Sequence, residues 1–400
     1  MTTRLATSTA YDNAVAQLSN RQVQLTRQQE ELSAGLKVLR PSDDPTAAAQ
    51  AERASTREAR ITTDERALEV QKNAVSTAES TLGDTVTALQ SFRTLVVQAG
   101  NTTLSSSDRA TIATQLTTLR NQILGYANTQ DSNGQPLFGG LGSTSTPFVD
   151  NGTGVSFNGL AGQPGSSSVA VPQVLDGYST FMNVPTGNGT FTISQAAGTT
   201  GVSSDAGQVT DPTAVTGHSY QVQFAVSSAT PPATTYSVVD TTTGTTLQSA
   251  QNYTSGQSIS FDGMSLTPSG TPANGDALNV APSTKTSLFG VLDQAIAGLS
   301  GDASSSAVAQ TVAQSLSQID SATTRVSATR GRAGDLLNQV DDITSRQDTL
   351  SEQLETVRSN AQDLDMVKGL SDFQTSQTAY SAALGSYAQI QKLSLFNYIS

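Results

Sequence analysis

The sequence predicts an α+β fold in which both termini form a long antiparallel helical coiled-coil rod, with an all-β region inserted at its tip. Near both ends, apolar residues recur at spacings that alternate between four and three. Eleven of the 13 prolines lie in residues 131–287, which also carry a single basic side chain against eight acidic ones. Because proline breaks helix interiors, long helices are expected only on either side of this stretch.

Residues 1–45 are predicted to be an N-terminal assembly helix followed by a turn. Its apolar seam consists of Tyr11, Val15, Leu18, Leu25, Leu32, Leu36 and Leu39. A period of about 3.5 residues keeps one stripe of a helix facing a partner helix. We expect the helix to run from about Tyr11 to Leu39 and to pack against other helices.

The turn that follows has a recognisable composition. It consists of Arg40, Pro41, Ser42, Asp43, Asp44 and Pro45. The first proline ends the preceding helix, a serine or aspartate caps the next one, and the second proline suits its first turn. The two aspartates also form a pair of candidate catalytic carboxylates, but helix capping explains them better.

Residues 46–135 are predicted to be the N-terminal half of the helical rod. Apolar residues at intervals of seven mark its first helix: Leu68, Val75, Leu82, Leu89 and Val96. Gly100-Asn101 ends this helix, and a second stripe from Ile112 to Tyr126 follows a cap-rich segment. The two stripes are expected to fold back as an antiparallel pair.

Residues 136–287 are predicted to form a variable β region of one or two small domains. Alternating polar and apolar residues indicate strands at 190–193, 220–226 and 235–239. Residues 258–266 are typical of a hairpin because Asp-Gly lies at their centre.

Residues 288–364 are predicted to form the C-terminal half of the rod, and residues 365–400 a C-terminal assembly helix. The first segment carries the seam residues Leu350, Leu354, Val357 and Leu364. The second carries a stripe for a chaperone or for packing, namely Phe373, Tyr380, Leu384, Tyr387, Ile390 and Leu395. Amphipathic helices usually bury such stripes in their own domain. Glutamines that interrupt these seams, such as Gln22 and Gln347, weaken them as isolated cores, so packing between molecules is favoured.

Composition excludes several classes of function. Without cysteine there is no disulfide or thiol nucleophile, and His218 is the only histidine. The net charge of −12 argues against nucleic-acid binding, and no apolar stretch is long enough to cross a membrane. No catalytic, metal or cofactor motif stands in a supporting context, so we expect neither an enzyme nor a bound cofactor. The first residues lack the apolar core of a cleavable signal peptide, which by itself would indicate a cytoplasmic protein.

Three segments resemble the bacterial flagellin superfamily. Residues 32–49, including the proline turn, are similar to its N-terminal signature, and the version found here fits hook–filament junction proteins better than filament flagellins. Residues 330–340 are similar to the C-terminal segment that the superfamily shares, whereas residues 380–384 and 391–399 are similar to the ending of hook–filament junction proteins more than to that of filament flagellins. The resemblance covers residues 1–140 and 285–400 and is weak between them.

The resemblance implies a structural subunit that joins hook to filament in the bacterial flagellum and polymerises through terminal coiled-coil helices. It implies an extracellular protein, exported through the flagellar type III apparatus without a cleaved signal peptide. The implied partners are further copies of the chain in a ring of about eleven subunits, the inner hook-associated junction protein, flagellin, and an export chaperone on the C-terminal segment. Neither nucleic acid nor membrane is among them.

Two alternatives remain at this point. The nearest is flagellin itself, the filament subunit, which copy number per filament would distinguish. A more distant one is a surface adhesin whose β region binds a ligand above a helical stalk. Loss of attachment in a fully motile strain would favour the adhesin.

Overall fold

The computed structural model describes residues 2–142, 146–301 and 303–399 and, within them, the side chains of residue 9 and residues 11–389. The chain folds into two compact units. Residues Met1–Arg66 and Thr344–Ser400 form the first, here called the terminal unit, and Ala67–Ile343 form the central unit.

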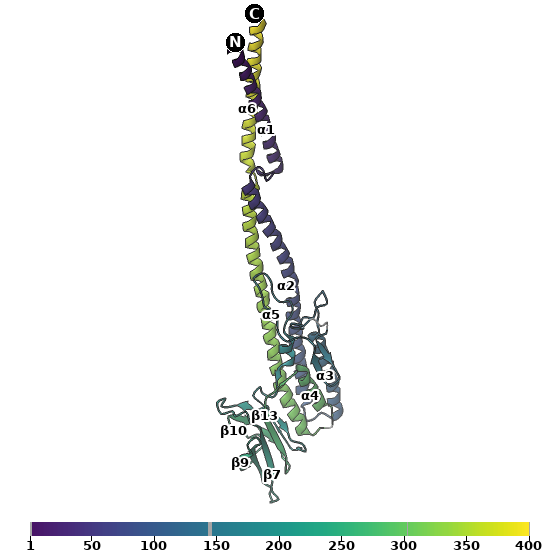
Figure 1. Ribbon diagram of the computed structural model, residues 1–400. Coiled ribbons are helices and arrows are strands. Elements are labelled where there is room, and N and C mark those ends of the chain that lie inside the picture. Colours follow the sequence, from purple (N-terminus) through teal and green to yellow (C-terminus); the bar gives the residue numbers. More distant parts are fainter. Residues whose placement is uncertain (1, 143–145, 302, 400) are drawn as a thin grey trace. The chain divides into compact units, whose positions relative to one another are not determined.

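The terminal unit is helical. It contains α1 (Thr2–Ala34), α6 (Met366–Ile399) and the adjoining parts of α2 (Pro45–Ala99) and α5 (Ser305–Gln362). Figure 1 shows α1 beside α6. The two helices are antiparallel, because Tyr11 near one end of the chain contacts Tyr387 near the other. This arrangement confirms the predicted pairing of the termini.

The helix α1 is shorter at its C-terminal end than the sequence predicts. It ends at Ala34 rather than Leu39, because Gly35 adopts a φ of +70° and leaves the helix in the left-handed conformation typical of a C-terminal cap. Leu36 and Leu39 therefore lie in the following loop. Leu364, expected within a helical series, lies in the break between α5 and α6. The proline at position 41 thus follows a helix that glycine has already ended.

In the central unit, α2 and α5 pair along their length. Ion pairs connect Lys72 to Asp341 at 3.2 Å and Arg93 to Asp320 at 2.8 Å. The residue numbers of the paired side chains rise along α2 as they fall along α5, so the two helices are antiparallel, as predicted. All five residues of the predicted seven-residue repeat of α2 are buried in the central core.

Two shorter helices complete the helical layer of the central unit. Helix α3 (Ser106–Ala127) begins with a capping box in which Ser105 and Asp108 exchange side-chain and backbone hydrogen bonds. Helix α4 (Leu288–Leu299) has Ser287 as its N-terminal cap and Ser300 as its C-terminal cap. The sequence interpretation did not separate α4 from α5, although the Ser-Gly pair at 300–301 is a signal for such a break.

Residues 137–142 and 146–184 pack on the helices rather than in the β domain. The ring of Phe181 lies at the centre of an aromatic cluster and pairs with the rings of Phe138, Phe148 and Phe289. Arg120 of α3 binds Asp150 and, at 2.9 Å, Asp293 of α4. Strands β1 (Phe148–Asp150) and β2 (Val155–Phe157) form a hairpin in this region, followed by a π-helical turn at Tyr178–Met182.

The rest of the insertion is one β domain. Its five-stranded antiparallel sheet has the order β4 (Phe191–Gln195), β13 (Ala277–Pro282), β7 (Tyr220–Val226), β8 (Thr234–Asp240) and β9 (Thr245–Asn252). A three-stranded sheet contains β10 (Ile259–Phe261), β11 (Met264–Leu266) and β6 (Gln208–Val209). The remaining pairs are β5 (Val202–Ser204) with β12 (Pro268–Gly270), and β3 (Val184–Pro185) with β14 (Lys285–Thr286). Apolar residues of both larger sheets share one hydrophobic core, so residues 191–280 form one domain rather than two.

The predicted strands and the Asp-Gly hairpin are confirmed. Phe261 pairs with Met264, and both turn residues, Asp262 and Gly263, have positive φ angles as a type I′ turn requires. Gln310 of α5 attaches the β domain to the helices. Its amide nitrogen donates to the Ile193 carbonyl at 3.1 Å, and its oxygen accepts from the Ser204 amide at 2.8 Å.

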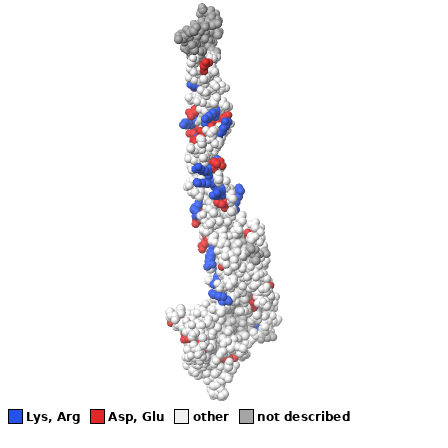
Figure 2. Space-filling model, in the orientation of Figure 1, with Lys and Arg blue, Asp and Glu red and all other residues white. Residues whose placement is uncertain are grey.

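Charge is distributed unevenly over the surface. In Figure 2, Lys and Arg gather over the long helices, whereas the β domain shows few charged side chains. This agrees with the single basic residue in 131–287. None of the helices in the described residues is long and apolar enough for a membrane span.

Candidate assembly site in the terminal unit

Helices α1 and α6 form a seam without a closed core. Among the described side chains of α1 (residues 9 and 11–34) and of α6 (residues 366–389), none is buried. Tyr11 is 47% exposed although its ring centroid lies 5.6 Å from that of Tyr387. The two helices thus bring together Tyr11 and Tyr387, one residue from each predicted stripe, and both rings remain partly open to solvent.

The exposure of the seam varies along the helix pair. Val15 and Leu384 are exposed, whereas several other predicted residues are half-buried: Leu18, Leu25, Leu32, Phe373, Tyr380 and Tyr387. The side chains of Ile390 and Leu395, also predicted to belong to the stripe, lie outside the described residues. The described side chains of these two helices therefore offer half-covered apolar surface along their length.

The central unit provides the contrast. There the seam residues Val75, Leu82 and Leu89 have no exposed area. Full burial of such a side chain contributes about 1.5–3 kcal/mol, whereas ordering one residue's backbone costs about 1–2 kcal/mol. Half-buried seams leave much of that ordering cost uncompensated. Helices α1 and α6 therefore need additional contacts to be as stable as the central helices.

A double backbone contact joins the loop after α1 to the break between α5 and α6. The Lys37 amide donates to the Gln362 carbonyl at 2.8 Å, and the Leu364 amide donates to the Gly35 carbonyl at 2.9 Å. The Lys37 ammonium group also donates to the Asn360 carbonyl at 2.7 Å. These bonds connect the segment between α1 and α2 to the segment between α5 and α6.

A small apolar cluster lies beside this junction. Val38, Ala47, Ala51 and Ala361 are buried together. Alanines let the backbone of the loop approach α2 and α5 closely. The sequence interpretation missed this cluster, although the spacing of four between Ala47 and Ala51 was a signal for a helix face.

The signature turn caps α2. An oxygen of Asp44 accepts hydrogen bonds from the backbone amides of Thr46 and Ala47, both at 3.0 Å. The Thr46 hydroxyl donates to the same oxygen. The hydrogen bond from the Ala47 amide is the main cause of the lowered pKa of Asp44, and the one from the Thr46 hydroxyl is the second. Asp43 accepts from the Arg40 amide at 2.9 Å and thereby closes the turn. The turn hydrogen bonds account for both carboxylates, in keeping with the expected capping role.

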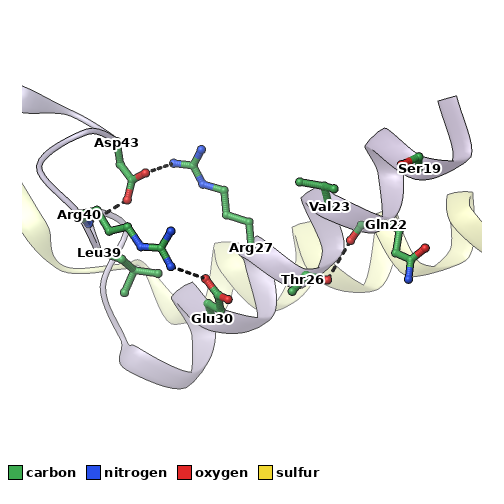
Figure 3. A pocket seen from close by; sticks show the side chains of 9 residues that line it. All are labelled: Ser19, Gln22, Val23, Thr26, Arg27, Glu30, Leu39, Arg40 and Asp43. Atoms are coloured by element: carbon green, nitrogen blue, oxygen red, sulfur yellow. Dashed lines mark hydrogen bonds and ion pairs between the residues drawn. The ribbon is translucent and has the colours of Figure 1, made fainter. Parts of the chain in front are cut away.

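An open groove runs between α1 and this turn (Figure 3). Arg27 lies between two acids, with Glu31 at 2.8 Å and Asp43 at 3.7 Å, and the hydrogen bond to Glu31 is the main cause of its raised pKa. Leu39, one of the predicted seam residues, lines this groove together with the exposed Val23. The groove has a volume of about 420 Å³ and offers both apolar and charged contacts to a partner.

The start of α6 adds exposed apolar surface that the sequence interpretation missed. Asp365 caps the helix by accepting from the amides of Val367 and Lys368. Beyond the cap, Val367 is 83% exposed, and Met366 and Leu370 are also exposed. Adjacent apolar residues in the first turn of a helix were the available signal.

The remaining predicted seam residues line a second groove within the terminal unit. Leu350, Leu354 and Val357 of α5 face Arg57 and Arg60 of α2 across it. The groove has a volume of about 410 Å³ and is mostly apolar. In the described part of the chain, no group of three or more His, Cys, Asp or Glu side chains is placed to hold a metal ion.

Comparison with known proteins agrees with this arrangement. The models of the bacterial flagellin N-terminal and C-terminal helical regions match residues 5–143 and 316–399. Flagellar hook-associated protein 3 of Salmonella typhimurium is 37% identical over 151 residues, which are 38% of this chain and 47% of that protein. The present chain therefore spans about half the length of the curated relatives that it matches.

Solved structures match over a greater length. The flagellar junction protein FlgL from Legionella pneumophila is 31% identical, with a TM-score of 0.67 over 73% of this chain and 99% of that one. FlgL from Xanthomonas campestris is 28% identical, with a TM-score of 0.68 over 77% of this chain and 99% of that one. The chain belongs to the flagellin superfamily and, within it, to the family of FlgL, the flagellar hook-associated protein 3.

Proposed function

We propose that this chain is a structural subunit of the junction between hook and filament of the bacterial flagellum. The observation that carries the proposal is the open seam of α1 and α6, in which no described side chain is buried. The similarity to FlgL of Legionella pneumophila, a flagellar junction protein, supports it. A structural rather than catalytic role is part of the proposal.

The subunit polymerises through its terminal helices. Neighbouring copies cover the half-exposed seam and supply the apolar burial that α1 and α6 lack alone. Because the ordering cost is then met by contacts between molecules, folding of the terminal helices is coupled to assembly. A closed ring of about eleven copies satisfies every such contact without leaving a free edge.

Its other partners follow from its place in the flagellum. The ring contacts the inner hook-associated junction protein on one side and flagellin on the other. Before export through the flagellar type III apparatus, which needs no cleaved signal peptide, a chaperone covers the stripe that contains Phe373, Tyr380 and Leu384. Substituting Leu384→Asp should weaken co-purification with that chaperone, and undiminished co-purification would count against the assignment.

The assembly role is tested by charging the seam. Leu25→Asp places a carboxylate in the half-buried seam and should abolish motility in cells whose only copy carries it. The exposed Gln24→Asp adds the same charge on the same helix outside the predicted seam and should leave motility intact. Full motility with Leu25→Asp would contradict the proposed assembly surface.

Hydrogen exchange on the purified monomer tests the coupled folding. Residues 9–34 and 366–389 should exchange much faster than the β domain at residues 191–280. Equal protection of the helices and the β domain would mean that the seam is already stable in the monomer. A self-contained stalk would then become the better explanation.

A filament subunit is the second candidate, because the matched family models describe flagellin terminal regions. Quantitative mass spectrometry of isolated flagella separates the two. A junction subunit is present at a small, fixed number per filament regardless of filament length. A number that rises with filament length would identify flagellin.

A further inference from the structure

The groove between α2 and α5 of the terminal unit combines exposed apolar and basic groups. Leu350 is 50% and Val357 48% exposed along one wall. Arg57 and Arg60 line the other and have no ion-pair partner within the part of the chain that the structure describes. Asp64 is the one acidic residue among the lining residues. Two neighbouring like charges three positions apart on a helix repel each other, so the groove favours an acidic occupant.

The opposite side of α5 carries the complementary charge. Asp348 and Glu352 each lie two positions from Leu350, which corresponds to about 200° around the helix. They are four positions apart and therefore share one face, where their charges repel. Both side chains are exposed, and neither forms an ion pair with any described residue.

We propose that the groove of one copy receives the Asp348–Glu352 face of a second copy of this chain, as a side-by-side contact between terminal units. The inference rests on the proposed junction function and specifies how its subunits meet. Arg57 and Arg60 pair with the two carboxylates, and the partner helix covers Leu350 and Val357.

Geometry on the chain itself favours a second copy as the occupant. The acidic pair flanks Leu350, so it lies at the same height along α5 as the groove. Two copies placed side by side in the same orientation therefore present the acidic face of one to the groove of the other. Since each copy carries both surfaces on opposite sides, the contact is heterologous and repeats from copy to copy, as a ring requires.

Charge reversal tests the contact in cells whose only copy of the gene is the variant. Arg57→Glu with Arg60→Glu should abolish motility and release flagellin into the medium, and Asp348→Lys with Glu352→Lys should do the same. All four substitutions in one chain restore opposite charges at every contact and should restore motility. Normal motility with either pair alone, or no recovery with all four, would overturn the proposal.

Cross-linking tests the geometry without altering the four charges of the contact. Because the chain has no cysteine, two substitutions introduce the only thiols: Gln353→Cys in the groove, and the exposed Glu355→Cys, which lies beside Glu352 on the acidic side of α5 at nearly the same height as Gln353. Oxidation of assembled flagella should produce a ladder of oligomers from the double variant and only monomers from each single variant. Dimers from Gln353→Cys alone, or no ladder in motile cells, would refute a heterologous contact.

The outcome also separates this inference from the proposed function. If deletion of the gene leaves filaments attached to hooks, the junction function itself is wrong. If deletion detaches them and the wild-type gene restores them, yet no ladder forms, only the groove contact is wrong. Cross-linked products that contain a different flagellar protein in place of a second copy of this chain would likewise refute the self-contact.

Discussion

Gln347 of α5 offers a direct test of how α2 and α5 are stabilised within the terminal unit. Its side chain is only 4% exposed, yet neither the amide nitrogen nor the amide oxygen has a hydrogen-bond partner among the described residues. It occupies the position in the four-three series where Ile343 precedes and Leu350 follows. A polar side chain at such a seam position lowers the stability of the helix pair.

The magnitude follows from the missing hydrogen bonds. An unpaired polar group in a buried site costs about 1–3 kcal/mol. Leucine has a similar size, carries no polar atom and favours the helix, so Gln347→Leu removes this cost without leaving a cavity. The free energy of unfolding of the part of the α2–α5 pair that lies in the terminal unit should rise by about 1–3 kcal/mol.

Urea unfolding, followed together with hydrogen exchange at residues 344–362, measures this change. The matched control is Gln353→Leu, an exposed position six residues further along α5, which should alter the free energy of unfolding by no more than about 0.5 kcal/mol. A Gln347→Leu variant no more stable than the wild type would show that the amide is satisfied in solution. The reasoning from its unpaired atoms would then be wrong.

Three further predictions concern the central unit. Arg120→Ala leaves Asp150 and Asp293 without their cation and should reduce the free energy of unfolding by about 3 kcal/mol. This value is at the lower end of the range for breaking buried pairs because both acids are partly exposed. An unchanged urea midpoint would contradict this prediction. The Gly152 amide first, and Arg120 second, lower the pKa of Asp150 below its usual 3.8, so its contribution is complete above that value and is lost as the pH falls through the folded pKa. Thermal unfolding should therefore show a weaker loss of stability below about pH 4 in Asp150→Asn than in the wild type, and identical pH profiles would argue against the assignment. Gly263→Ala would place a Cβ 2.2 Å from the Asp211 carbonyl oxygen, whereas the Cβ of the control Gly244→Ala meets nothing within 4 Å at a similar φ. The β domain should therefore unfold at a lower urea concentration in Gly263→Ala than in Gly244→Ala. Equal urea midpoints would refute the steric explanation.

Local patterns in the sequence were sufficient for much of the fold. The Asp-Gly pair at 262–263 predicted the hairpin because its turn needs two positive φ angles, and the repeat of seven in α2 predicted its buried face. The pattern failed at the end of α1. Proline at position 41 is the stronger helix breaker, but Gly35 ends the helix first because Leu36 and Lys37 find backbone partners on the other side of the chain. Such partners are more than three hundred positions away and have no local signature.

The candidate site shows the same division. The sequence alone determined that the terminal helices carry apolar seams and that the insertion cannot form long helices, because residue spacing and proline content act within one segment. Only the tertiary structure decided how far each seam is covered, since burial depends on which helices meet. It also decided that Val38 packs in one cluster with Ala361 and that Arg57 and Leu350 share one groove. These features arise from contacts between segments at opposite ends of the chain, and no local pattern specifies the distance between them.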